Sequence, residues 1–171
     1  MATDDTTTMI HPQTRIGHIH LTVADLNRSL AFYRDLLGFT VTMGYGDSAV
    51  FLSAGGYHHH IGLNTWAGKG ATPAPSGHTG LYHFAILYPN RHELAKALKR
   101  LLDAHYPLQG ASDHGVSEAI YVADPDGNGV ELYVDRPSET WPRDADGMLK
   151  MGGRQALDVN NLLAALEPEE P

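Results

Sequence analysis

The chain carries an internal repeat, and this repeat restricts the fold more than any other feature of the sequence. Each copy reads as a strand, a helix and three further strands. His18 and His83 stand 65 residues apart in the first strands of the two copies, and Asp25 and Asn90 stand equally far apart at the starts of the two helices. A repeat of this length predicts two similar modules that pack face to face.

The first copy begins with a strand over 15–23, in which apolar and polar residues alternate. A helix is expected over 27–37, with Asp25 or Asn27 as its N-cap and Gly38 at the position where a glycine ends a helix. Glycines separate three short strands that follow, expected at 39–45, 49–53 and 58–64.

The second copy repeats this order. A helix is expected from Asn90 to about residue 104, because Asn90 and Glu93 have the spacing of a capping box. Residues 124–128, with the sequence Asp-Pro-Asp-Gly-Asn, predict a tight turn between the last two strands. The four strands of this copy are expected at 81–88, 108–111, 117–123 and 129–134.

The predicted class is α+β, with two βαβββ modules. We expect five segments along the chain: a flexible tail at 1–14, the first module at 15–66, a linker loop at 67–79, the second module at 80–136, and a C-terminal extension at 137–171 that holds a short helix.

Composition excludes several classes of function. The 171 residues include no cysteine, which excludes disulfides and thiolate metal sites, and the formal net charge of -8 disfavours a nucleic-acid partner. We find no signal peptide and no apolar stretch long enough for a membrane helix, so we expect a cytoplasmic protein without membrane contact. The 11 histidines are unusual, and histidine is the commonest metal ligand.

The repeat predicts a metal site. His18 and His83 occupy equivalent strand positions, which converge in a fold with a pseudo-twofold axis. Glu131 lies between apolar neighbours on the last strand, where a carboxylate is costly to bury without a positive partner. Two imidazoles and one carboxylate form the facial triad of non-haem iron(II) oxygenases. His20 shares a strand face with His18 and is the alternative first ligand; the repeat favours His18.

Three further features accompany these ligands. The run His58-His59-His60 falls on the predicted fourth strand, where at most two of the three side chains share a face. His114 lies in a predicted turn, and Tyr121 lies on the strand before the Asp-Pro-Asp-Gly turn. Each has an ordinary alternative interpretation as a packed or solvent-exposed side chain.

From about residue 16 to 141 the chain resembles the vicinal oxygen chelate superfamily, which includes glyoxalases, bleomycin resistance proteins and dioxygenases. The resemblance is carried by Gly17-His-Ile-His-Leu-Thr-Val23, by Gly80-Leu-Tyr-His-Phe-Ala-Ile86 and by the segment from Ser112 to Leu132. Within the superfamily the chain is most similar to type I extradiol dioxygenases of the catechol 2,3-dioxygenase kind. The resemblance implies paired βαβββ modules that form a cupped mixed sheet around one metal, with the helices outside.

The resemblance also implies a role for each residue. His18, His83 and Glu131 match the iron ligands, and His59 matches the acid–base histidine. Two more positions match residues that contact the substrate, His114 and Tyr121. Many such enzymes have four modules and this chain has two. A homo-oligomer, dimeric or larger, is expected, and the metal could form within one chain or between swapped chains.

These matches imply an iron(II) enzyme, with manganese(II) as the alternative metal, that opens a small aromatic diol such as a catechol with O2. The alternatives are a glyoxalase-type isomerase, an antibiotic-modifying thiol transferase, or a non-enzymatic drug-binding protein. An isomerase of this kind usually takes a carboxylate from each module, yet Asp47 is the only acidic residue between Asp35 and Glu93. A transferase that handles a phosphonate needs cations, yet Lys69 is the only basic residue between Arg34 and Arg91.

Overall fold

The computed structural model describes residues 9–75, 77–150 and 155–167. Its helices and strands follow the order of the predicted repeat. The first module contains β1 (Ile19–Thr22), α1 (Leu26–Leu30), η2 (Ala31–Leu36), β2 (Thr40–Tyr45), β3 (Ala49–Ser53) and β4 (Ile61–Asn64). The second contains β5 (His83–Leu87), α2 (Arg91–Asp103), β6 (Gly110–Asp113), β7 (Ser117–Ala123) and β8 (Gly129–Asp135). The C-terminal extension contains η3 (Ser138–Thr140), β9 (Gln155–Ala156) and α3 (Val159–Ala164).

Each module forms its own mixed sheet. The strand order is β1-β4-β3-β2 in the first module and β5-β8-β7-β6-β9 in the second. The first strand of each module runs parallel to the fourth strand, and the other pairs are antiparallel. The α+β class is therefore confirmed, but the single cupped sheet becomes two sheets, with β1 and β5 as edge strands that do not pair with each other.

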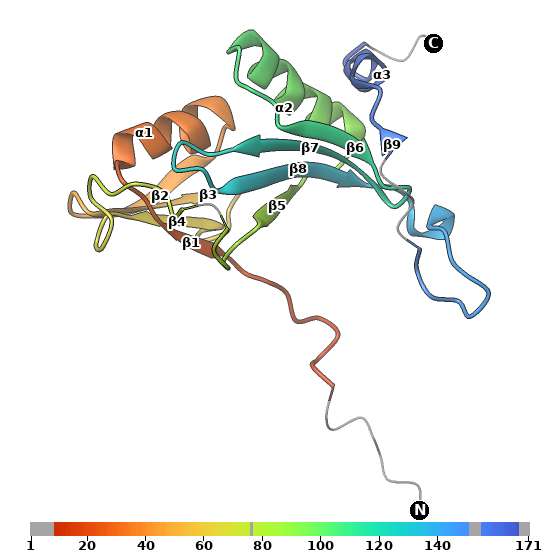
Figure 1. Ribbon diagram of the computed structural model, residues 1–171, viewed down its shortest axis with the longest axis horizontal. Coiled ribbons are helices and arrows are strands. Elements are labelled where there is room, and N and C mark those ends of the chain that lie inside the picture. The colour runs from red at the N-terminus through yellow and green to blue at the C-terminus, as the bar shows by residue number, and fades with distance from the viewer. Residues whose placement is uncertain (1–8, 76, 151–154, 168–171) are drawn as a thin grey trace, which may run out of the picture.

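The helices α1 and α2 cover the two sheets on the same side of the molecule (Figure 1). Burial alternates accordingly along the strands: Val130, Leu132 and Val134 of β8 are buried, while Glu131 and Tyr133 are partly exposed. The helix-facing side chains of both modules join one apolar core. The opposite sheet faces carry the polar side chains that the sequence singled out.

Asp25 caps α1 by accepting a hydrogen bond from the backbone N–H of Arg28, and Gly38 follows η2 with a φ of 90°. The predicted helix is not uniform, because it widens into the π-helical η2, in which the Leu37 N–H bonds the Phe32 carbonyl at 2.9 Å. A π-helical turn of this kind often marks a functional or packing constraint. Phe32 and Tyr33, consecutive in η2, are both buried.

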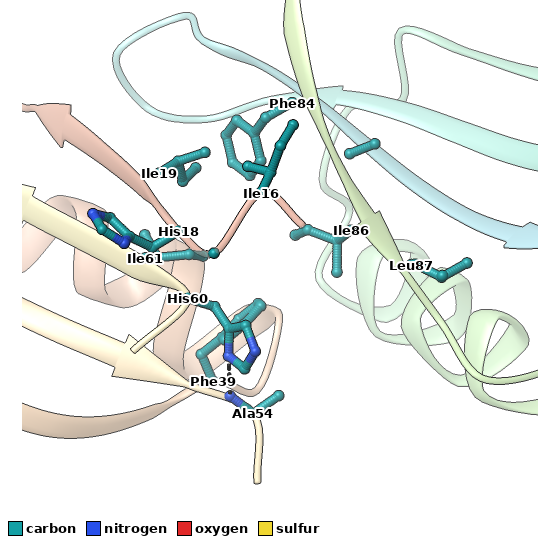
Figure 2. Close-up of a pocket in the computed structure, with 12 residues that line it drawn as sticks. Ile16, His18, Ile19, Phe39, Ala54, His60, Ile61, Phe84, Ile86 and Leu87 are labelled. Atoms are coloured by element: carbon teal, nitrogen blue, oxygen red, sulfur yellow. Dashed lines mark hydrogen bonds between the residues drawn. The ribbon is translucent and has the colours of Figure 1, made fainter. Parts of the chain in front are cut away.

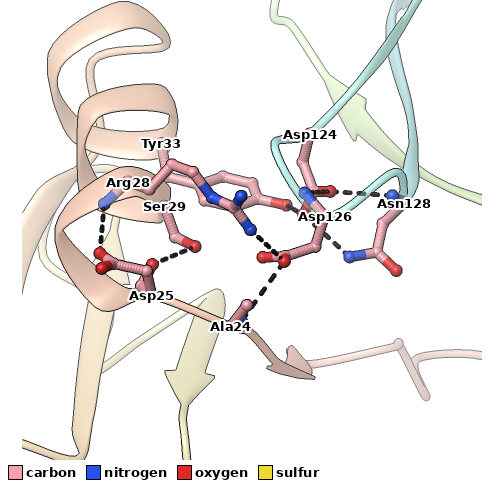
Figure 3. A network of polar contacts seen from close by, with 8 residues as sticks. All are labelled: Ala24, Asp25, Arg28, Ser29, Tyr33, Asp124, Asp126 and Asn128. Carbon is pink, nitrogen blue, oxygen red and sulfur yellow. Dashed lines mark hydrogen bonds and ion pairs between the residues drawn. The ribbon is translucent and has the colours of Figure 1, made fainter. Parts of the chain in front are cut away.

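A buried polar network joins the two modules (Figure 3). The Tyr33 hydroxyl donates to Asp124 Oδ2 at 2.7 Å, across from η2 to the turn between β7 and β8. Asp126 of the same turn pairs with Arg28 and accepts a hydrogen bond from the Ala24 N–H. These contacts fix the turn of the second module against the helix of the first.

Several local expectations were wrong at their edges. His58, His59 and His60 precede β4 rather than lie on it, since the strand begins at Ile61. The expected short helix of the extension is α3, with Asp158 as its N-cap. The extension also contains η3 and β9, which were not expected. Residues 1–8 of the predicted tail lie outside the described residues, so the segment bounds stay predictions. No helix within the described ranges is long and apolar enough to cross a membrane.

Candidate metal centre and active site

Four polar side chains of the second module form one hydrogen-bonded chain. Tyr121 of β7 lies directly opposite Glu131 of β8, and His83 lies at the start of the neighbouring β5. The His83 Nε2 and Glu131 Oε2 atoms are 2.9 Å apart, and the Tyr121 hydroxyl donates to Glu131 Oε1 at 2.9 Å. His114 Nε2 is 2.8 Å from the same hydroxyl. The structure thus brings together His83, Glu131, Tyr121 and His114.

This chain of contacts fixes the proton on His114. A tyrosine hydroxyl has one hydrogen, and here it goes to Glu131, so the hydroxyl oxygen must accept from His114 Nε2. His114 therefore carries a proton on Nε2. Its side chain, which the sequence placed in a turn, is buried, at 8% exposure. Burial holds the imidazole at one distance from Tyr121 and suits a residue that orients a ligand.

Glu131 is 12% exposed, and both of its oxygens have partners, which offsets the cost of burying a carboxylate. Gly129 makes the approach of His83 possible, because a Cβ at Gly129 would stand 2.4 Å from the Tyr82 carbonyl oxygen and 2.9 Å from His83 Cβ. Gly129 is thus a positioning residue that the sequence pattern marked only as the start of a strand.

The His83–Glu131 pair fits a metal ion. Two donor atoms bound at right angles to one metal, at about 2.1 Å each, are separated by about 3 Å. The observed separation of 2.9 Å between Nε2 and Oε2 is that of a direct ion pair, and it also agrees with this metal geometry. An imidazole nitrogen and a carboxylate oxygen are also the donor types that first-row divalent metals accept.

His18 does not join this pair. No three or more histidine, aspartate or glutamate side chains in the part of the chain that the structure describes are close enough to share a metal ion. His18 instead lines a cavity of about 360 Å³ between β1 and β5, together with Ala85, the neighbour of Glu131 across the β5–β8 pair (Figure 2). The role of His18 as the third ligand therefore stays a prediction.

The predicted acid–base residue, His59, lies beside His18, with the two ring centres 4.5 Å apart. Its Nδ1 atom is 2.7 Å from Nδ1 of His58. Desolvation, followed by the nearby positive charge that His18 can carry, lowers the pKa of His59 below its usual value. The two predicted residues of the first module, His18 and His59, thus lie together, and neither His83 nor Glu131 is among the residues that line the cavity at His18.

The rival ligand, His20, is engaged elsewhere. Its ring lies over Gly62, where an added Cβ would stand 2.9 Å from two ring carbons. The same ring contacts Phe51 and Trp66, with ring centres 5.6 and 5.4 Å away. His20 therefore belongs to an aromatic cluster on the face of the first sheet and is not grouped with His83.

The strand registers show which residues of the first module are equivalent to Glu131 and Tyr121 of the second. His20 pairs with Gly62 in the β1–β4 ladder, as Ala85 pairs with Glu131 in the β5–β8 ladder. Gly62 is therefore the counterpart of Glu131, and Phe51, which pairs with Gly62, is the counterpart of Tyr121. The first module thus presents no carboxylate where the second presents Glu131.

The family model described as the Glyoxalase/Bleomycin resistance protein/Dioxygenase superfamily matches residues 15–132. The chain belongs to this superfamily. A catechol-2,3-dioxygenase of Bacillus subtilis is 46% identical over 156 residues, which cover 91% of this chain and 53% of that protein. A biphenyl-2,3-diol 1,2-dioxygenase of Rhodococcus globerulus is 32% identical over 122 residues, covering 71% of this chain and 63% of the relative. The chain thus spans a little over half the length of these relatives.

Solved structures agree on the fold of this superfamily member. A glyoxalase/dioxygenase from Nostoc punctiforme superposes with a TM-score of 0.63 at 18% identity, covering 76% of this chain and 98% of that one. At this identity the likeness establishes the fold alone. The resemblance read from the sequence is confirmed by the family match and by the dioxygenase relatives.

Proposed function

We propose that the protein is an iron(II)-dependent extradiol dioxygenase that opens catechol or a substituted catechol with O2. The observation that carries this proposal is the His83–Glu131 pair at 2.9 Å with Tyr121 bonded to the same carboxylate. The named activities of the two dioxygenase relatives support it. Because the chain spans about half the length of those proteins, their activity is proposed for this chain and not transferred to it.

The superfamily and the dioxygenase relatives imply a metal cofactor. We propose iron(II), with manganese(II) as the alternative, held by His83, Glu131 and, as third ligand, His18. Such a ligand set leaves about three coordination positions for the diol and O2, and bound iron(II) would supply the electron path between them.

Tyr121 and His114 would orient the diol. The Tyr121 hydroxyl lies beside Glu131, and its oxygen can accept a hydrogen bond from a diol hydroxyl. His114 donates to Tyr121 through Nε2 and holds the hydroxyl in place. Burial of His114 excludes water from this side of the site, which strengthens each hydrogen bond.

His59 would exchange a proton with the diol or with oxygen. Its Nδ1 already faces His58 Nδ1, so the exchange falls to Nε2. A neutral imidazole suits this role because it can accept a proton, and the lowered pKa of His59 favours the neutral form. His59 packs on His18, so it would reach the diol only from the side of the first module.

Gly62 disfavours the isomerase alternative. A glyoxalase-type site was expected to need an acidic ligand from each module, and the counterpart of Glu131 in the first module has no side chain. The His20 ring also fills the space that a side chain at position 62 would need.

The decisive experiment is anaerobic reconstitution with iron(II), followed by addition of catechol and oxygenated buffer. We expect oxygen uptake and a yellow ring-opened product. Glu131→Gln keeps the size of the side chain and should lose metal binding, measured by competition with a chromogenic chelator. Absence of oxygen uptake with every one of several catechols would contradict the proposal. A homo-oligomer and a cytoplasmic location are further predictions, which sedimentation and cell fractionation would check.

A further inference from the structure

A second, smaller cavity opens on the sheet face of the second module, beside the proposed metal pair. Its volume is about 260 Å³, and it is lined by residues of the second module alone. His83 and Tyr121 line it, as do Gln109, Gly110 and Ser112, at and just before β6. The cavity therefore adjoins the proposed site at His83 and Tyr121.

Gly110 creates this space. It lies directly opposite Tyr121 in the β6–β7 ladder, and an added Cβ would meet only Tyr121 Cδ2, at 4.0 Å. The counterpart in the first module is Met43, which lies opposite Phe51. The same position of the repeat is thus filled by a large side chain in one module and left empty in the other.

The size of the cavity limits its occupant. A cavity of about 150 Å³ is enough to bind benzene. A volume of about 260 Å³ therefore fits one aromatic ring with a small substituent, and it is too small for two complete rings.

The lining is mixed, because Val122 and Val130 line the cavity beside its polar groups. Ser112 and Gln109 supply a hydroxyl and a carboxamide, each able to donate and accept hydrogen bonds. Among the residues that the structure describes, no lysine or arginine lines the cavity. A carboxylate would therefore be buried without a cation, close to the negative charge of Glu131, and that burial is unfavourable.

We propose that this cavity receives the diol ring of the substrate together with its substituent, and that it selects monocyclic catechols with a small, uncharged, hydrogen-bonding substituent. The inference rests on the proposed dioxygenase function, because it places the diol at His83 and Tyr121. Gly110 would set the permitted size of the substituent, and Ser112 with Gln109 would set its polarity.

The test compares catechol with its 4-methyl, 4-hydroxymethyl and 4-carboxyl derivatives and with biphenyl-2,3-diol, using the iron(II)-loaded protein. Turnover is measured as kcat/KM, and binding of each diol is measured by calorimetry under argon, without turnover. We expect the hydroxymethyl compound to be preferred over the carboxyl compound and the biphenyl. Gly110→Val should lower kcat/KM for the hydroxymethyl compound about 10-fold or more relative to catechol, because it fills the cavity.

Ser112→Ala should reduce the preference for hydroxymethyl over methyl by about 3- to 10-fold, the value of one neutral hydrogen bond. Gly44→Val is the matched control, since a Cβ at Gly44 also meets nothing closer than 4.0 Å and lies on β2 of the first module. It should leave the substrate order unchanged.

The inference would be overturned if Gly110→Val changed all diols by one common factor, or if the carboxyl compound bound as tightly as the hydroxymethyl compound. Failure of the proposed function is a separate result, namely no oxygen uptake with any diol. In that case the dissociation constants from calorimetry still test the inference. If Gly110→Val and Ser112→Ala leave the order of diol affinities unchanged, the cavity does not select the substituent.

Discussion

The hydrogen bond between Tyr33 and Asp124 can be removed with little other change, by Tyr33→Phe. The hydroxyl donates to Asp124 Oδ2 at 2.7 Å, and both side chains are buried, at 0% and 4% exposure. The substitution deletes one oxygen from the contact between the modules and keeps the ring that packs against Phe32 and Phe84.

The expected loss of stability depends on the hydrogen bonds that Asp124 keeps in the variant. A hydrogen bond to a charged group contributes about 1.5–3 kcal/mol. Asp124 Oδ2 still accepts from the Asn128 side chain, and Oδ1 still accepts from the Asp126 and Asn128 N–H groups. We therefore expect a loss near the lower end, about 1.5–2 kcal/mol, which lowers the Tm by about 3–8 °C for a chain of this size.

Urea unfolding followed by circular dichroism measures this loss, and Tyr106→Phe is the matched control. Tyr106 donates to the Ala123 carbonyl, a neutral acceptor within the second module, so its loss should be about 0.5–1.5 kcal/mol. If Tyr33→Phe destabilised the protein no more than Tyr106→Phe does, the Tyr33–Asp124 bond would not hold the modules together as the geometry indicates.

The same pair predicts a dependence on alkaline pH. Burial, together with the charge of Asp124, raises the pKa of Tyr33 far above its usual value. Above pH 10 the unfolded tyrosine loses its proton while the native one keeps it, so the native state binds more protons and stability falls as pH rises. The stability that the raised pKa of Tyr33 contributes is fully present below pH 10. Tyr33→Phe should reduce the fall by up to about 1.4 kcal/mol per pH unit, and an unchanged slope would refute the assignment.

Three other substitutions test other parts of the structure. Tyr121→Phe removes a hydrogen bond to Glu131 and should weaken metal binding about 10- to 100-fold. Equal metal affinity of variant and parent in a chelator competition would mean that Tyr121 does not hold Glu131 in place for the metal. Gly62→Ala forces the His20 ring to move and should destabilise the fold by about 1–3 kcal/mol; a neutral effect in urea unfolding would mean that the ring moves freely. Asp158→Ala removes the N-cap of α3 and should cost about 0.5–2 kcal/mol, with no change in metal affinity expected.

Much of the fold was predictable because its signals are local. The glycines around β3 and the tight turn after β7 placed these strands correctly, and Asn90 fixed the start of α2. The first helix begins at Leu26, capped by Asp25, one residue before the expected start. The strand face shared by Glu131 and Tyr133 also followed from alternation. The π-helical turn of η2 was not predictable, because it depends on how two consecutive aromatic side chains reach the same core.

The candidate site was predictable in part. His83, Glu131 and Tyr121 come together because they lie on the neighbouring strands β5, β8 and β7 of one module. Their grouping needs no contact between the two modules. The role of Gly62 was hidden, since loop lengths differ between the copies and the offset of 65 residues at His18 becomes 69 at Gly62. Sequence spacing alone therefore does not show that Gly62 is equivalent to Glu131. The registers of the β1–β4 and β5–β8 pairs show it.

The His20 ring over Gly62 also bears on how a duplicated module diverges. A glutamate at position 62 would restore the symmetry of the repeat with a single residue change. The ring now stands where the new side chain would begin, and it is held between Phe51 and Trp66. A carboxylate in each half would need a change at position 62 together with displacement of the His20 ring. The difference between the two halves of this chain is in that sense difficult to remove with one substitution.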